Sequence, residues 1–288
     1  MTTPRSIVCS SRVLAAVLAT GTLLTTAACS SAEDGASAGS ETASAAVERA
    51  RATQTGSPTS TASSPTASSS ASQLTETGAK NALITAADIE DNWTQVENPQ
   101  AWKDSLLVGK VDVAAFVTGK SDAQDCQNLV DSLYDETLLG STSGASALTG
   151  FQEDDARLLY QVASYDKAAL DKSMTSLQSL PDTCDQFTLT GGDNGDRTVQ
   201  VVAMSLPDVG DARQGMTVTV KGDSNGRPVT LTVDVAVVQV GANAITVTNG
   251  GTAGISHDTT TTAVKQGTQR LQEVLAGGTP QPTPSGIN

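Results

Sequence analysis

Apolar side chains recur every three or four positions in several stretches of this chain, which is the spacing of a helix with one buried face. The clearest case is 121–139, whose apolar face runs from Cys126 to Leu138 and which Gly140 follows. Pro181 is expected to end another such stretch, because proline disfavours continuation of a helix. The helices predicted by this spacing cover 85–92, 121–139, 166–180 and about 259–276.

Two of these helices begin with the residues of a capping box, a hydroxyl residue followed three positions later by an acid or an amide. Thr85 with Asp88 and Ser121 with Gln124 have this spacing. Both pairs support a helix start at the predicted place.

Between the helices lie runs of β-branched residues that are typical of strands. In 229–235 apolar and polar residues alternate strictly, so one face of this strand is expected to be buried and the other wet. Asn225-Gly226, between two such runs, is a strong hairpin signal. Consecutive hairpins predict an α+β fold, an antiparallel sheet with helices packed mainly on one face. The predicted strands are 156–165, 197–206, 215–222, 227–240 and 243–248.

The first 28 residues have the order of a secretory signal peptide: basic residues, an apolar run over 13–24, then small residues. Ala27-Ala28-Cys29 resembles a bacterial lipobox, with Thr26 where leucine is usual. We expect removal of 1–28 and acylation of Cys29, which would hold the protein at the extracytoplasmic face of the cell membrane. The alternative is an ordinary secreted protein with an incidental Cys29.

The amino-acid composition after residue 28 indicates a linker, one folded domain and a tail. Residues 29–78 are mostly Ser, Thr, Ala, Gly and Pro and predict a disordered linker, either a plain spacer or an O-glycosylated one. The predicted domain covers 79–277, and 278–288 reads as a disordered tail. The formal net charge of −14 argues against nucleic acid as a partner and against adhesion to anionic lipid. The expected contact with the membrane is therefore the lipid on Cys29.

The four cysteines predict one disulfide. Cys9 is lost with the signal peptide and Cys29 carries the lipid, which leaves Cys126 and Cys184 in an exported domain. The alternative is two buried free thiols. A redox-active pair is disfavoured because the chain has no Cys-x-x-Cys motif.

Four segments in order carry a resemblance to a known family: "DAQDCQNLVDSL", "LDKSMTSLQSLPDTCDQFTL", "LPDVGDARQGMTV" and "VVQVGANAITVT". Over about 83–276 the chain resembles the extracellular sensor domain of PknH-type mycobacterial serine/threonine kinases and actinobacterial lipoproteins with that domain. The resemblance implies a disulfide between Cys184 and Cys126 and a cleft for an external ligand. The kinase domains carry two disulfides, whereas this chain has one candidate pair.

The sequence offers little catalytic chemistry. His257 is the single histidine, too few for a zinc site, so we expect no metal and no cofactor. His257-Asp258 could be two members of a hydrolase triad, but no Gly-x-Ser-x-Gly accompanies them, and a surface or capping role is favoured. The acidic runs 153–155 and 193–196 are expected to form turns. Trp93 and Trp102 bracket one loop and are candidate ligand contacts; the alternative is that they cover the edge of the core.

These observations predict a non-catalytic, membrane-anchored binding protein with a sensor-like domain for a small ligand or an envelope protein. The alternative is a carrier of an apolar ligand or lipid, which would need a large apolar cavity. A hydrolase is the weakest of the three hypotheses.

The lipid anchor gives a direct test. In Cys29→Ser the acyl acceptor is gone, so we expect the protein to leave the membrane fraction for the soluble fraction, measured by immunoblot after fractionation. Ser30→Ala, the matched control next to it, should stay in the membrane fraction. Membrane retention of Cys29→Ser would show that the lipoprotein prediction is wrong.

Overall fold

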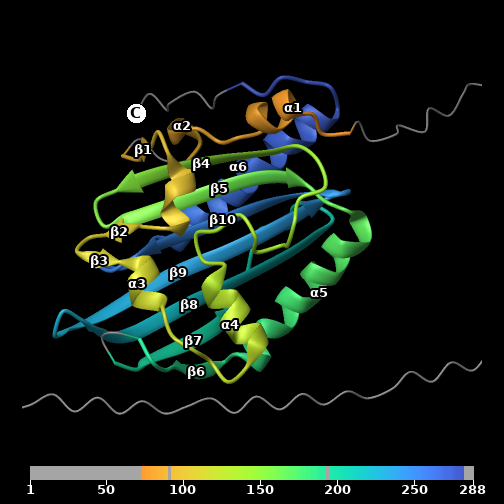
Figure 1. Ribbon diagram of the computed structural model, residues 1–288. Helices are drawn as coiled ribbons and strands as arrows, with labels where there is room; N and C mark the ends of the chain where they lie inside the picture. The colour runs from red at the N-terminus through yellow and green to blue at the C-terminus, as the bar shows by residue number, and fades with distance from the viewer. Residues whose placement is uncertain (1–72, 90–91, 193–194, 282–288) are drawn as a thin grey trace, which may run out of the picture. The chain divides into compact units, whose positions relative to one another are not determined.

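The central feature of this computed structural model is one eight-stranded antiparallel sheet, in the order β1-β4-β5-β10-β9-β8-β7-β6 (Figure 1). The structure describes residues 73–89, 92–192 and 195–281, all within the second of the chain's two units, Pro65–Asn288. A separate small hairpin pairs β2 with β3. The strands are β1 (Thr94–Gln95), β2 (Leu107–Val108), β3 (Val111–Asp112), β4 (Ser146–Glu153), β5 (Ala156–Ser164), β6 (Gln186–Leu189), β7 (Arg197–Ala203), β8 (Ala212–Ser224), β9 (Arg227–Val240) and β10 (Asn243–Gly251).

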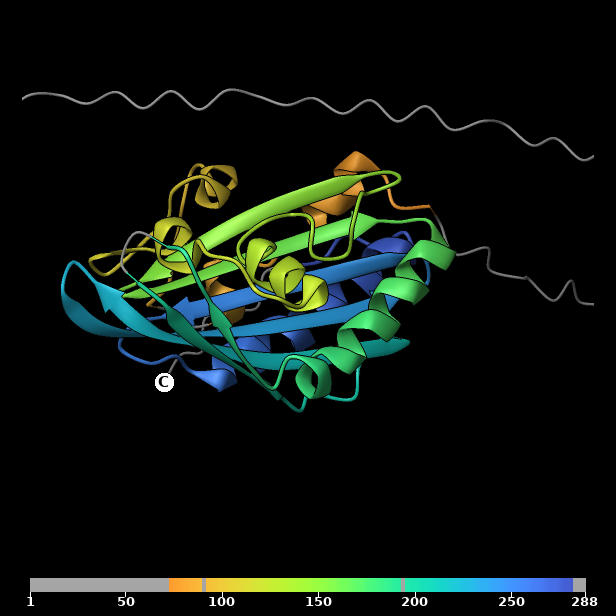
Figure 2. The same ribbon diagram turned by 60° about the horizontal axis from the view of Figure 1, so that its bottom comes forward.

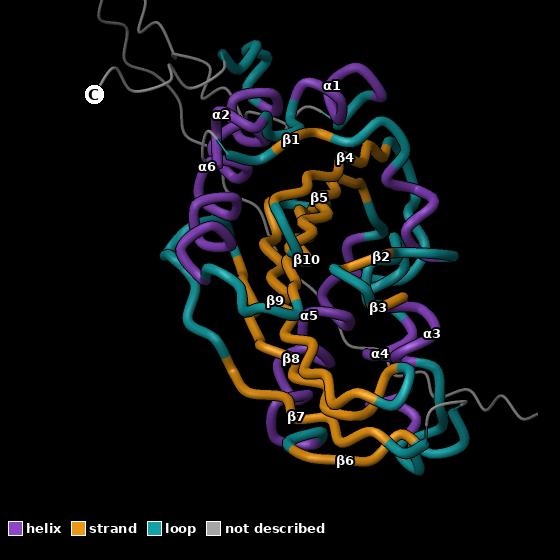
Figure 3. Tube along the Cα trace, turned by 90° about the vertical axis from the view of Figure 1, so that its left-hand side faces the viewer, coloured by secondary structure: helices purple, strands orange, loops and turns teal. Residues whose placement is uncertain are grey.

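Helices cover both faces of this sheet (Figures 2 and 3). The cause is visible in β9, where Ala236 and Val238 enter one apolar cluster and Val237 enters the other. Helices α1, α2 and α6 contribute to the first of these clusters, and α3, α4 and α5 to the second. The helices are α1 (Glu76–Asn81), α2 (Ala86–Ile89), α3 (Val113–Val117), α4 (Gln124–Asp131), α5 (Lys167–Thr183) and α6 (His257–Leu275), with a 3₁₀ turn η1 (Pro99–Lys103).

The predicted α+β class with an antiparallel sheet is confirmed. The helices are shared between the two faces more evenly than expected, because the central strands are apolar on both sides. The predicted hairpin is also confirmed: Asn225 and Gly226 have φ of 53° and 73°, and Ser224 pairs with Arg227. Such a two-residue turn matches the twist of the strands that it joins. Within the described residues, α1 starts three residues before the predicted domain boundary at 79.

Of the two predicted capping boxes, the first forms and the second does not. The Asp88 carboxylate accepts a hydrogen bond from the Thr85 backbone N–H at 2.7 Å, as the box predicts. The pair Ser121 and Gln124 forms no such box, because α4 has Ala123 at its N-cap and its first residue is Gln124.

The helix predicted over 121–139 is wrong in length, since α4 ends at Asp131. Tyr134 has φ of 59°, a conformation incompatible with continuing a helix. This conformation places the Tyr134 ring in the core, edge-on to Trp102. The Tyr134 hydroxyl donates a hydrogen bond to the Arg157 carbonyl at 3.1 Å. Tertiary packing of one aromatic side chain therefore overrides the helical periodicity.

Helix α6 is fixed to its face by a buried ion pair and by a close approach. The Arg270 guanidinium lies 3.4 Å from the Asp88 carboxylate, and both side chains are buried. Gly267 packs directly on Tyr160 of β5, and a Cβ at this glycine would overlap the tyrosine hydroxyl. Burial raises the pKa of that hydroxyl, so it remains protonated and fits against the helix as a neutral group. Within the described part of the chain, no helix is long and apolar enough to cross a lipid bilayer.

Gly267→Ala tests this close approach. Replacing a glycine by alanine inside a helix normally stabilises it by up to ~1 kcal/mol. Here the methyl group must displace Tyr160, so we expect a loss of about 1–3 kcal/mol in the free energy of unfolding, measured by urea titration. Lys265→Ala, exposed on the same helix, should change little. A Gly267→Ala protein as stable as wild type would contradict the contact.

Candidate functional site

A groove of about 480 Å³ lies between α4 and α5. Its floor consists of leucine side chains, and hydroxyl and carboxylate groups surround them. We call this the α4–α5 groove. It is lined by Asp125, Asn128, Leu129, Asp131, Ser132, Asp135, Thr137, Leu138, Ser173, Ser176, Leu177 and Leu180.

The lining of the α4–α5 groove has one sign of charge. Three aspartates, Asp125, Asp131 and Asp135, lie around it, and no lysine, arginine or histidine is part of it. Asp125 and Asp131 are exposed to solvent, while Leu129 and Leu177 are buried beneath the rim. The groove therefore offers carboxylates to a bound group and apolar atoms below them.

A disulfide ties the two walls of the groove together. Cys126 of α4 and Cys184, directly after α5, are bonded, which confirms the predicted pair. Both residues are buried in the core cluster that α4 and α5 share. The bond spans 58 residues of sequence, and closing a loop of that length stabilises by roughly 4 kcal/mol in the chain-entropy account. The short helix α4 is thus held against α5 covalently as well as by packing.

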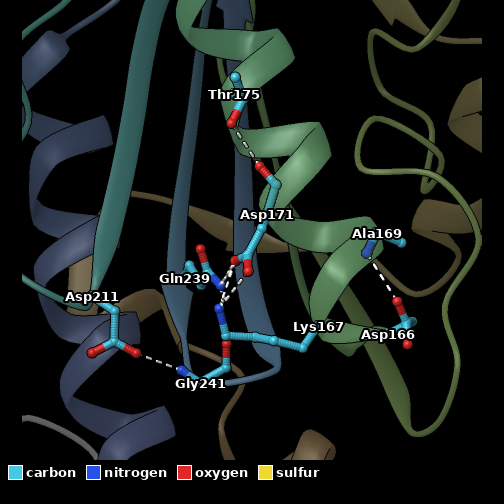
Figure 4. A network of polar contacts seen from close by, with 8 residues as sticks. All are labelled: Asp166, Lys167, Ala169, Asp171, Thr175, Asp211, Gln239 and Gly241. Carbon is cyan, nitrogen blue, oxygen red and sulfur yellow. Dashed lines mark hydrogen bonds and ion pairs between the residues drawn. The ribbon is translucent and has the colours of Figure 1, made fainter. Parts of the chain in front are cut away.

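The first turn of α5 is fastened to the sheet by polar contacts (Figure 4). Asp166 caps the helix by accepting a hydrogen bond from the Ala169 N–H at 2.9 Å. Asp171 accepts from Gln239 of β9 at 2.8 Å and from Lys167 at 2.6 Å. The Gln239 hydrogen bond, followed by the one from Lys167, lowers the pKa of the Asp171 carboxyl. These contacts fix one end of the groove wall.

His257 has a partner that sequence reasoning missed. It is the first residue of α6 and largely exposed, as predicted, but its Nδ1 lies 2.6 Å from the carboxylate of Asp234, not of Asp258. Asp234 is fully buried and also accepts hydrogen bonds from Thr217 and Thr260. The alternation of apolar and polar residues in β9 predicted that Asp234 faces solvent. In the structure, the start of α6 covers this side chain instead. The cluster fastens α6 to β8 and β9.

The two tryptophans lie in different parts of the core. Trp93 is buried in the cluster under α6, whereas Trp102 packs against the opposite cluster beside Tyr134. Neither tryptophan lines the α4–α5 groove. The two rings therefore pack in different clusters, and a role of either as a ligand contact stays a prediction.

Cys29 and the tail from 282 lie outside the described residues. Asp154 and Asp155 form the turn between β4 and β5, and the run 193–196 lies partly outside the described residues. Across the described ranges, no group of three or more His, Cys, Asp and Glu side chains is arranged to hold a metal ion.

Among known proteins, three solved chains match this structure. No protein-family model and no curated protein matches this sequence. Among solved structures, the crystal structure of the extracellular domain of PknH from Mycobacterium tuberculosis is similar, with 11% sequence identity and a TM-score of 0.43. The match covers 69% of this chain and 97% of that chain. The function proposed below rests on this chain's own residues.

Asp171 gives a test of the contacts at the start of α5. Because its pKa is lowered in the folded protein, its charge stabilises the fold above the ordinary carboxyl pKa of ~3.9, and this contribution is lost as the pH falls below that value. We expect Asp171→Asn to lower the melting temperature more at pH 7 than at pH 2.5, because the charge is lost as the pH falls through the lowered pKa. Asp182→Asn, an exposed acid at the other end of α5, is the control. An equal deficit for Asp171→Asn at both pH values would contradict this account.

Proposed function

We propose that this chain is a lipid-anchored, extracytoplasmic binding protein without catalytic activity, and that the α4–α5 groove holds a basic segment of a partner protein. The observation that carries the proposal is the rim of three aspartates, without any cation, above a leucine floor. A lysine or arginine side chain inserted there would gain charge-assisted hydrogen bonds. Its methylene groups would lie against the leucines.

Rigidity of the groove supports a binding role. The disulfide joins the two helices, and the contacts of Asp171 fasten α5 to the sheet. A preformed site loses less conformational entropy when a partner binds than a mobile one does. Complementary charge across such a site mainly raises the rate of association and selects the partner.

The chemistry of the described residues favours binding over catalysis and over lipid transport. His257 is held by Asp234, and no serine or cysteine hydrogen-bonds to it within the described part of the chain. The α4–α5 groove and a larger cleft of about 850 Å³ are both lined mostly by polar side chains, whereas a lipid carrier needs a large apolar cavity. Acylation at Cys29 would keep this binding surface at the membrane, and the linker would give it reach.

The proposal is tested with a synthetic ten-residue peptide of alternating lysine and leucine, labelled with a fluorophore and titrated with the full-length protein in detergent. We expect Asp125→Asn/Asp131→Asn/Asp135→Asn to weaken binding at least ~10-fold, since hydrogen bonds to charged groups contribute about 1.5–3 kcal/mol each. Fluorescence anisotropy measures the affinity.

A matched variant separates the groove from general charge attraction. Glu97→Gln/Asp104→Asn/Asp258→Asn removes the same number of exposed acids elsewhere, and should cost only the small, salt-sensitive contribution of long-range charge. If both triple variants weaken binding equally, or if the peptide does not bind wild type, the proposed site is wrong.

A further inference from the structure

A second, larger cleft lies at one end of the sheet, away from the α4–α5 groove. It has a volume of about 850 Å³, and residues of the β2–β3 turn and of the β8–β9 hairpin line it. We call it the hairpin cleft. Figure 1 shows β2, β3 and the free end of the β8–β9 hairpin at the same left-hand end. The volume is within the range of about 300–1,000 Å³ that small-molecule sites occupy.

Both walls of the hairpin cleft are built on tight turns. On one wall, Gly109 of the β2–β3 turn has φ of 60°, and the Asp155 carboxylate lies where its Cβ would contact it at 3.0 Å. On the other wall, Asn225 and Gly226 form the two-residue turn of the hairpin. Each wall is thus a short turn that joins two hydrogen-bonded strands.

The charge of the hairpin cleft is opposite to that of the chain. Acidic residues outnumber basic ones by 31 to 17 in the sequence, yet the cleft is lined by Lys110 and Arg227 against one acid, Asp155. Neither cation forms an ion pair with any residue in the described ranges. The two come from opposite walls, Lys110 from the β2–β3 turn and Arg227 from the start of β9. Both cations therefore attract an anion into the same cleft.

The remaining lining groups add hydrogen-bonding capacity. Asn225, Thr230 and Thr252 supply amide and hydroxyl groups, and Asp155 accepts a hydrogen bond from Thr252 at 3.4 Å. A carboxylate has about four acceptor positions, so Asp155 can also accept from hydroxyl groups of a ligand. Arginine and lysine together recognise phosphate, the first through paired N–H groups and the second as a point charge.

We propose that the hairpin cleft binds a phosphorylated polyol, with Lys110 and Arg227 on the phosphate and Asp155 on a hydroxyl group. This site is separate from the partner site of the proposed function, and either can fail without the other. The ligand's chemistry is shared by free polyol phosphates and by phosphorylated lipid headgroups, and the experiment distinguishes these two sources.

The experiment measures binding of glycerol 3-phosphate, inorganic phosphate and glycerol to the full-length protein by isothermal titration calorimetry. We expect both phosphates to bind and glycerol not to bind. Lys110→Ala/Arg227→Ala should weaken both phosphates at least ~10-fold. Both side chains are exposed, and an unchanged melting temperature confirms that this variant folds.

Asp155→Asn separates the two halves of the site. It removes the carboxylate that accepts from the ligand's hydroxyl group, so glycerol 3-phosphate should bind more weakly. Inorganic phosphate should bind as well as before or better, because a nearby negative charge is gone. A variant that merely distorted the cleft would weaken both ligands together.

A control variant tests general charge attraction, and lipid vesicles test the phosphorylated headgroup as the ligand. Lys103→Ala/Lys265→Ala removes two exposed cations elsewhere and should leave phosphate binding unchanged. Vesicles of phosphatidylcholine with phosphatidylglycerol, compared with pure phosphatidylcholine, test the headgroup. Binding of either source that depends on Lys110 and Arg227 supports the site. The proposal is overturned if neither source binds, if glycerol binds as well as its phosphate, or if both double variants behave alike.

Discussion

The fold depends on the burial of its central strands on both faces. Along β9, Ala236 and Val238 pack under α6 while Val237 packs under the opposite layer, and β5 and β10 are buried along almost their whole length. A sheet with two apolar faces is stable in water only if helices cover both of them. The positions of α5 and α6, and of the clefts beside them, follow from this requirement.

The two helical layers are fixed by different means. Helix α6 is held by the buried Arg270–Asp88 pair, by Asp234 at its start and by the glycine that admits Tyr160. The layer of α4 and α5 relies on the Cys126–Cys184 bond, because α4 is only 8 residues long and isolated helices of that length are unstable. The bond that stabilises α4 also holds the two walls of the acidic groove at a fixed distance.

Local sequence patterns predicted much of the fold. Features that depend on contacts between distant segments could not be predicted from the sequence. The β-branched residues of β9, the Asn225-Gly226 turn and the cysteine pair were sufficient because each depends on neighbouring residues or on simple counting. The length of α4 and the burial of Asp234 depend on what packs against them, which periodicity cannot show. The hairpin cleft joins turns more than 100 residues apart in the sequence, so no spacing in the chain predicts it. Its formation requires the strand order of the sheet.

We have proposed that the α4–α5 groove is the surface that binds a partner protein. Site-specific photo-cross-linking in the native cell tests it most directly, with benzoylphenylalanine at Asn128 in the groove or at Thr198 on the exposed face of β7. We expect a cross-linked protein from position 128 alone, with the adduct mapped by mass spectrometry to a lysine- or arginine-rich segment. No adduct at position 128, or the same adduct from both positions, would contradict it.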